Sequence, residues 1–209
     1  MTLTVTAAFD RVLVARHGET EWNRVGRRQG QLDSPLTDSG HEQASLIVST
    51  VALAPIDAIF SSPLGRARTT ARVIAVALCR ELVVVDELAE VHHGAFAGLT
   101  NAEIEERFPG ELDRRSRDKY RWRFPNGESY KQAGQRAAVA LQRIEVAGSR
   151  KPLLITHEMI TRMLLKVLLQ LEPDAALALS LPYGVVMAVS PATRMLEQLQ
   201  PPEPPHTSV

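Results

Sequence analysis

Short apolar segments with strand character alternate along this chain with longer segments whose apolar residues recur at helical spacing. The segments predicted to form strands are 11–16, 58–61, 83–85, 152–156 and 184–189. Helices are predicted over 41–52, 64–82, 130–147 and 159–170, with a charged helical section over 100–120. This alternation favours an α/β fold, in which helices cover both faces of a mostly parallel sheet.

The 209 residues are enough for one large domain with a well-buried core. We find no internal repeat or linker, and we expect a single domain over 1–200 and a proline-rich, disordered tail over 201–209. Cys79, the only cysteine, rules out an internal disulfide and is expected to be a small buried apolar residue.

The charges of the chain are balanced, with 24 Lys plus Arg and 24 Asp plus Glu. No overall field would therefore attract nucleic acid or an anionic membrane. The N-terminal segment lacks the cationic start and long apolar stretch of a signal peptide, and no segment is long and apolar enough to span a bilayer. We expect a cytoplasmic protein without nucleic-acid or membrane partners.

Two of the predicted strands end abruptly in a histidine, the first at His17 and the fourth at His157. In α/β sheets, ligands bind beyond the C-terminal ends of the strands. Arg16 precedes His17, and a turn at Gly18 could bring both side chains toward one cleft. The alternatives are structural: His17 as a surface residue beside a salt-bridging arginine, and His157 as a core or helix-capping residue.

Two further clusters follow predicted strands. Arg66 and Arg68 lie in the first turns of a predicted helix, where a cation is unfavourable for the helix but suits a bound anion. A solvated helix face is the alternative for Arg68. Glu90 lies in a glycine-containing loop, where partial desolvation could raise its pKa and make it a general acid.

The histidines give little support to a metal site. His92 and His93 are adjacent, and adjacent histidines rarely bind one ion. The zinc-protease pattern HExxH fails at His157 because position 161 is threonine.

Phosphoryl transfer requires cations around the equatorial oxygens, a nucleophile in line and an acid near the leaving oxygen. A neutral imidazole can be the nucleophile, and arginine matches phosphate geometry. The clusters supply each of these groups: Arg16, His17, Arg66, Glu90 and His157. We interpret the combination as a phosphotransfer site.

The same segments resemble a known family. Residues 16–20 (RHGET), followed by Asn23, resemble the RHGE signature of the histidine phosphatase superfamily, in its phosphoglycerate mutase-like branch. The segments SSPLGRARTTA, LAEVHHGAFAGLT, FPNGES and ITHEMITRMLL resemble its later blocks, so the resemblance runs from about residue 11 to 190. It implies a three-layer α/β/α sandwich with a mostly parallel central sheet.

The resemblance also implies roles for individual residues. His17 would be the nucleophile that carries the phosphoryl group, and Glu90 the proton donor to the leaving group. Arg16, Arg66 and His157 would hold the phosphoryl oxygens. Substrate contacts are expected from Asn23, Gln29 and Glu19. No metal and no organic cofactor is implied.

One position departs from the family pattern. Glycine usually follows the second histidine, whereas this chain has Glu158. The carboxylate could narrow the pocket, or it could point away and orient His157.

The middle section between Gly98 and Pro125 is shorter than the substrate-enclosing segment of phosphoglycerate mutases. A more open site favours hydrolysis, so we expect a phosphatase acting on small-molecule phosphate monoesters. A cofactor-dependent phosphoglycerate mutase and a non-catalytic phosphate-binding module are the alternatives. Arginines within 114–123 could meet a second anionic group of the substrate or form a solvated face, and the apolar stretch 177–189 could support a homodimer.

Overall fold

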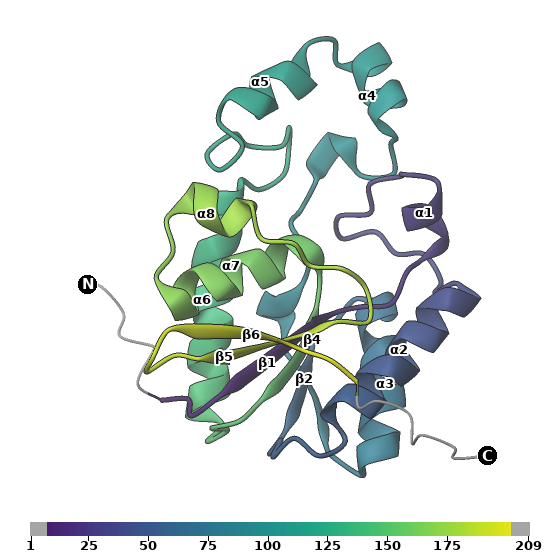
Figure 1. The fold of residues 1–209 in the computed structure, drawn as a ribbon. Coiled ribbons are helices and arrows are strands. Elements are labelled where there is room, and N and C mark those ends of the chain that lie inside the picture. The colour runs from purple at the N-terminus through teal and green to yellow at the C-terminus, as the bar shows by residue number, and fades with distance from the viewer. Residues whose placement is uncertain (1–7, 202–209) are drawn as a thin grey trace, which may run out of the picture.

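The computed structural model describes residues 8–201, in which a six-stranded sheet lies between two layers of helices (Figure 1). The strands are β1 (Val12–Arg16), β2 (Ile59–Ser61), β3 (Leu82–Val84), β4 (Leu153–Thr156), β5 (Val186–Ser190) and β6 (Met195–Leu199). Their order is β3-β2-β4-β1-β5-β6. The pairs β2–β3, β2–β4 and β1–β4 are parallel, and β5 is antiparallel to both β1 and β6. The predicted three-layer, mostly parallel α/β fold is confirmed.

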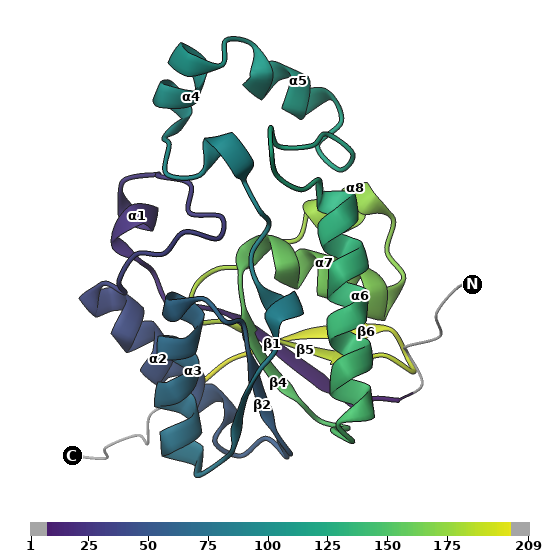
Figure 2. The same cartoon turned by 180° about the vertical axis from the view of Figure 1, so that it is seen from behind.

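Helices cover both faces of the sheet, as Figure 2 shows from behind. One layer contains α2 (Asp38–Val51) and α3 (Gly65–Leu78), and the other contains α6 (Tyr130–Val146) and α7 (Glu158–Leu169). Side chains of β1 alternate between the two cores: Leu13 and Ala15 pack toward α2 and α3, and Val12 and Val14 toward α6 and α7. Burial on both faces explains why β1 is an uninterrupted apolar run.

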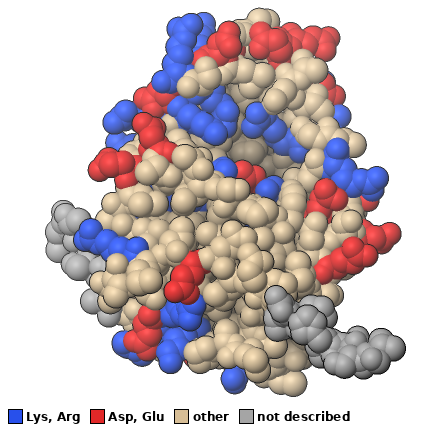
Figure 3. All heavy atoms as spheres, viewed as in Figure 1, with Lys and Arg blue, Asp and Glu red and all other residues tan. Residues whose placement is uncertain are grey.

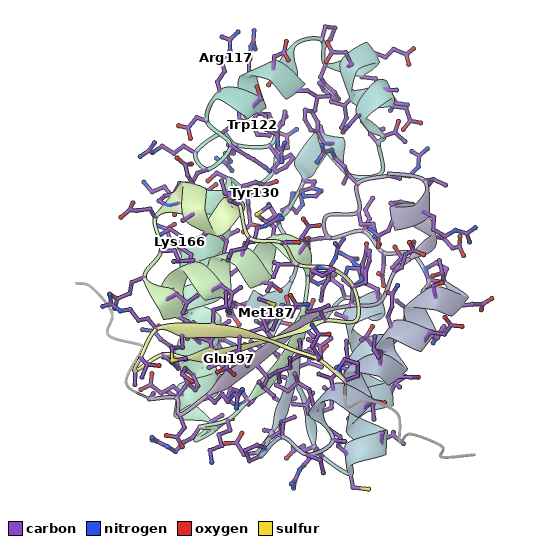
Figure 4. The ribbon with its side chains drawn as sticks, viewed as in Figure 1. Arg117, Trp122, Tyr130, Lys166, Met187 and Glu197 are labelled. Carbon is purple, nitrogen blue, oxygen red and sulfur yellow. The ribbon has the colours of Figure 1, made fainter. Side chains whose placement is uncertain are left out.

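A segment of short helices extends beyond the C-terminal ends of the parallel strands (Figure 1). It contains the 3₁₀ turn η3 (Gly94–Phe96), α4 (Asn101–Arg107) and α5 (Glu111–Arg117). Its aromatic rings pack in tilted and edge-to-face pairs: Phe96, Phe108, Trp122 and Phe124. Trp122 and Tyr130 lie between α5 and the helical layer below (Figure 4). We call this part, residues 94–124, the cap segment.

Several elements differ from the sequence prediction. The charged section 100–120 is two helices, because the chain turns at Pro109 and Gly110, where Gly110 has φ of 77°. Three elements were not predicted: α1 (Glu21–Arg24), α8 (Pro173–Leu177) and β6. A further 3₁₀ turn, η2 (Asp86–Leu88), lies in the predicted loop after β3.

The prediction that Cys79 is buried is wrong. Cys79 follows the last residue of α3, adopts a left-handed conformation with φ of 50° and is exposed. The apolar run around it suggested burial, but the helix ends one residue earlier and turns the side chain outward.

Residues 202–209 of the predicted tail 201–209, and the first seven residues, where a signal peptide was not expected, lie outside the described residues. Within residues 8–201, no helix combines the length and the apolar character needed to cross a bilayer.

Candidate active site

The two strand-end histidines meet because β1 and β4 are parallel neighbours. Arg16 pairs in register with Thr156, and the backbone N–H of His17 donates to the carbonyl of Thr156 at 2.9 Å. The imidazole rings of His17 and His157 lie edge to face with centroids 5.1 Å apart. Arg66, near the start of α3, and Glu90, after η2, reach the same end of the sheet.

The hydrogen bonds of His17 define its tautomer. Nδ1 lies 2.7 Å from the carbonyl oxygen of Gly18, which can only accept, so the proton is on Nδ1. Nε2 therefore carries a lone pair, to which Nε of Arg66 donates at 3.2 Å. Burial, followed by the charges of Arg66 and Arg16, holds the pKa of His17 well below its usual value. The ring is neutral, with an unprotonated Nε2 that can act as a nucleophile.

His157 is fully buried, and its Nε2 lies 2.7 Å from the hydroxyl of Ser62. The Ser62 oxygen also accepts from the backbone N–H of Leu64 at 3.2 Å. Nδ1 of His157 is buried and has no hydrogen-bond partner among residues 8–201. Burial, followed by the charge of Arg66, lowers the pKa of His157 well below its usual value. His157 is thus a neutral ring with one unpaired nitrogen.

Arg66 connects the nucleophile to the loop after α1. Besides donating to His17, it donates from Nη1 to the Leu32 carbonyl at 2.7 Å and to the Asp33 carboxylate at 3.0 Å. Nη2 donates to the Gly30 carbonyl at 2.8 Å. These bonds fix a buried guanidinium beside His17.

Arg16 is held between an anion and an aromatic ring. Its Nη1 forms an ion pair with the Glu158 carboxylate at 2.8 Å, and its guanidinium lies 4.1 Å from the centre of the Tyr183 ring. Its Nε is buried and has no hydrogen-bond partner within residues 8–201. Glu158 therefore does not contact His157 but reaches the Arg16 side of the pocket.

Glu90 is buried, and its Oε1 accepts from the backbone N–H of Val91 at 2.9 Å. Burial raises the pKa of Glu90 and outweighs the hydrogen bond from Val91 and the charge of Arg66, which both lower it. A protonated carboxyl in the cavity that also exposes His17 can donate a proton to a leaving group.

Arg136 of α6 holds the Glu90 loop in place. It donates to the carbonyls of Glu87, Ala89 and Glu90 at 2.6–3.2 Å. Its other side forms two hydrogen bonds with the Glu128 carboxylate, at 2.9 and 3.0 Å. The turn 124–129 thus supports the site indirectly, through Glu128.

Arg16, His17, Arg66 and Glu90 line a cavity of about 280 Å³ between the sheet and the cap segment, whereas His157 lies buried behind His17 and is not among the lining residues. Figure 3 shows the hollow at this level, with basic side chains around it. Its lining residues are Arg16, His17, Asn23, Gly26, Arg27, Arg28, Gln29, Gly30, Arg66, Glu90, His93, Asn101 and Glu158.

Three of the four arginines that line the cavity are ion-paired: Arg16 with Glu158, Arg66 with Asp33 and Arg27 with Glu103. Arg28 has no carboxylate partner in the described part of the chain and donates instead to Asn101 at 2.8 Å. On the cap segment, Arg114, Arg117, Arg121 and Arg123 are exposed, and Arg117 points away from the protein (Figure 4).

The predicted substrate residues lie in different places. Asn23 and Gln29 line the cavity, and both contact the Thr20 side chain: Thr20 Oγ1 donates to Asn23 Oδ1 at 2.8 Å, and Gln29 Nε2 donates to Thr20 Oγ1 at 2.7 Å. Glu19 does not line the cavity, because its carboxylate accepts from the Thr37 hydroxyl at 3.1 Å.

His93 also lines the cavity, where its ring packs on Phe124 with centroids 4.5 Å apart. Burial, together with Arg28 and Arg115, lowers the pKa of His93 to about 3. It is therefore a neutral lining residue at physiological pH.

Sequence reasoning missed Ser62 and Arg136 and left the partner of Glu158 open. Ser62 lies in the short turn between β2 and α3, where a serine is a weak signal for a histidine partner. Arg136 looks like any arginine of an amphipathic helix, so nothing local identifies its three carbonyl partners.

The model of the histidine phosphatase superfamily (branch 1) matches residues 12–197. The chain belongs to this superfamily. A probable phosphoglycerate mutase of Yersinia enterocolitica is 39% identical over 168 residues, which cover 78% of this chain and 77% of that protein. Phosphoserine phosphatase 1 of Hydrogenobacter thermophilus is 37% identical over 119 residues, which cover 57% of this chain and only 56% of that protein. Members with similar sequences thus include phosphatases and mutases.

Solved structures of other proteins have the same fold. A structure titled as a putative alpha-ribazole-5'-P phosphatase from Escherichia coli superposes with a TM-score of 0.83 at 22% identity, covering 93% of this chain and 97% of that one. The mycobacterial glucosyl-3-phosphoglycerate phosphatase superposes with a TM-score of 0.77 at 27% identity, covering 87% of this chain and 90% of that one. At 22% identity, the similarity to the Escherichia coli structure shows the fold alone.

Proposed function

We propose that this histidine phosphatase chain hydrolyses small-molecule phosphate monoesters through a phosphohistidine at His17, with Glu90 as the proton donor. The observation that carries the proposal is the pairing in one cavity of a neutral His17, with Nε2 unprotonated, and a Glu90 whose pKa is raised. Anion binding alone needs neither group, which argues against a non-catalytic phosphate-binding module.

In the first step, His17 Nε2 attacks phosphorus, a P–N bond forms and the P–O bond to the alcohol breaks. The leaving oxygen takes the proton of Glu90 and departs as the alcohol. In the second step, water attacks phosphorus while the Glu90 carboxylate takes its proton, the P–N bond breaks and orthophosphate leaves. Arg16, Arg66 and His157 hold the phosphoryl oxygens, and the cycle uses no metal or organic cofactor.

Hydrolysis is favoured over mutase activity by the short cap segment, whose helices α4 and α5 have seven residues each. A site that admits water passes the phosphoryl group to water rather than back to a product. Two similar proteins are named phosphatases for phosphoserine and for glucosyl-3-phosphoglycerate, so the alcohol carried by the ester varies within the superfamily. Because the Yersinia enterocolitica relative is named a probable phosphoglycerate mutase, mutase activity is the second candidate function.

The test is hydrolysis of p-nitrophenyl phosphate by wild type and by His17→Ala, with EDTA present. We expect turnover by wild type and a loss of at least about 10⁴-fold in His17→Ala, because no other group can form the covalent intermediate. His41→Ala is the matched control, since His41 is exposed on α2. Turnover that survives in His17→Ala would exclude the mechanism, and orthophosphate binding without any wild-type turnover would favour a binding module.

Mutase and phosphatase activity are separated by incubation with 3-phosphoglycerate and a bisphosphate primer. We expect free orthophosphate, whereas 2-phosphoglycerate as the main product would identify a mutase. A panel of sugar phosphates, phosphoglycerates, nucleotides and phosphoamino acids then identifies the preferred ester.

A further inference from the structure

Glu158 lies where the superfamily pattern has glycine, directly after His157, and its side chain lines the catalytic cavity. The two oxygens of its carboxylate bind two different arginines. Oε2 lies 2.8 Å from Arg16 Nη1, and Oε1 lies 2.7 Å from Arg162 Nη1, one turn further along α7. The carboxylate is therefore fixed in place from two sides.

Arg162 is itself anchored. Its Nε and Nη2 donate to the carbonyl of Leu179 at 3.1 and 3.0 Å, so its remaining donor, Nη1, is aimed at Glu158. Side-chain exposure is 13% at Arg162 and 15% at Arg16, and 36% at Glu158, which lies between them. Such a partly buried, doubly anchored pair keeps its geometry better than an exposed ion pair does.

The contacts of Arg16 leave one edge of its guanidinium free. Nη1 is bound to Glu158, and the face lies on the Tyr183 ring at 4.1 Å. Nε–H and one N–H of Nη2 form the opposite edge, the planar fork that matches two oxygens of a phosphoryl group. Nε on this edge is buried and has no partner among residues 8–201. A buried, unpaired donor next to His17 indicates that a ligand oxygen completes it.

We propose that Glu158 is a positioning residue that anchors Arg16 by Nη1, so that the Nε–Nη2 edge faces the phosphoryl group transferred to His17. This inference rests on the proposed function and assigns a role at the same site. Arg162 and Tyr183 are the supports of the arrangement: Arg162 fixes Glu158, and Tyr183 fixes the plane of Arg16.

A double-mutant cycle tests whether Glu158 acts through Arg16. In the wild-type background, Glu158→Ala should lower kcat for p-nitrophenyl phosphate by about tenfold or more, because misplaced catalytic donors cost one to two orders of magnitude. Glu158→Gln should lower kcat by an intermediate factor of about threefold, since its single amide oxygen can accept from only one of the two arginines. In an Arg16→Ala background, Glu158→Ala should change kcat by less than about twofold.

Glu106→Gln is the matched control for loss of one negative charge, because Glu106 is exposed on α4 of the cap segment. The circular dichroism spectrum and thermal unfolding of each variant verify that it is folded. The proposal is overturned if Glu158→Ala retains the kcat of Glu106→Gln, or if it loses the same factor in both backgrounds.

An NMR measurement distinguishes failure of the positioning role of Glu158 from failure of the proposed phosphatase function. In ¹⁵N NMR, the Nε–H resonance of Arg16, identified by its absence in Arg16→Lys, should shift on addition of orthophosphate in wild type and Glu158→Gln. In Glu158→Ala, that resonance should be broadened and insensitive to orthophosphate. A wild type that hydrolyses nothing but shows this pattern would refute the phosphatase and retain the positioning role. An unchanged response in Glu158→Ala would refute the positioning role alone.

Discussion

His17 and Glu90 show how burial gives two residues opposite chemical roles. Uncharged forms are favoured in a buried site, so burial lowers the pKa of His17 from 6.5 and raises that of Glu90 from 4.5. With unshifted pKa values two units apart, a neutral histidine and a protonated glutamate would coexist in about one molecule in a hundred at best. The opposite shifts bring the proposed nucleophile and the proposed acid into the forms their roles require over the same pH range.

The pH dependence of kcat/KM follows from these shifts. Activity should rise with pH as His17 loses its proton, along an acid limb well below pH 6.5, and fall as Glu90 loses its proton, along a basic limb above pH 4.5. Glu90→Gln should abolish the basic limb. It should also lower kcat for an alkyl phosphate by about 10²–10³-fold, because an alkoxide needs the proton that the amide cannot give.

The measurement is a pH–rate profile with an alkyl phosphate and with p-nitrophenyl phosphate, whose leaving group needs little protonation. The loss in Glu90→Gln should be much smaller for the aryl ester. Equal losses with both esters would mean that Glu90 is not the proton donor.

At the scale of elements, the site depends on a helix that supplies no group to the cavity. α6 lies behind the Glu90 loop, and its Arg136 donates to three carbonyls of the segment 87–90 as well as to Glu128. The loop carbonyls have no strand or helix to pair with, so a cation from the neighbouring helix satisfies them.

Arg136→Met should lower the free energy of unfolding by about 1–3 kcal/mol, because it leaves the three carbonyls and Glu128 without their charged donor. It should also lower kcat, since Glu90 loses the support of its loop. Arg143→Met is the control on the same helix: Arg143 is 63% exposed and pairs with Glu87, so the expected cost is below about 1 kcal/mol. Urea denaturation and kcat would be measured for both, and equal effects on the two would contradict the proposed support.

Elements with strong periodicity were predictable, and elements defined by distant contacts were not. β1 and β4 are buried on both faces, so their apolar runs and histidine ends were visible in the sequence. β6 is an edge strand whose residues 195–199 are exposed or only partly buried and lack a continuous apolar run. The convergence of His17, Arg66, Glu90 and His157 followed from their places at strand ends, whereas the ion pair of Glu158 with Arg16 depends on side-chain geometry that no local pattern contains.

At the scale of the whole molecule, the cavity lies between the sheet and the cap segment, so a bound anion contacts both. Vanadate at about 100 times its Kd should add about 2.7 kcal/mol to the free energy of unfolding. For a domain of this size we expect the melting temperature to rise by about 5–10 °C. Differential scanning calorimetry measures the shift, and Arg16→Ala should show a smaller one. A wild type whose melting temperature does not change at saturating vanadate would contradict binding at this cavity.

The ion pairs of Arg16, Arg27 and Arg66 have a consequence for product release. An entering phosphate finds cations already neutralised by Glu158, Glu103 and Asp33, so it gains less than it would from unpaired arginines. In the transition state, the phosphoryl group has a different shape from that of bound orthophosphate. Only hydrogen bonds that are stronger in the transition state than in the substrate complex accelerate the reaction. Ion-paired arginines therefore bind orthophosphate less tightly. Weaker binding favours release of orthophosphate, the product common to the hydrolysis of all phosphate monoesters.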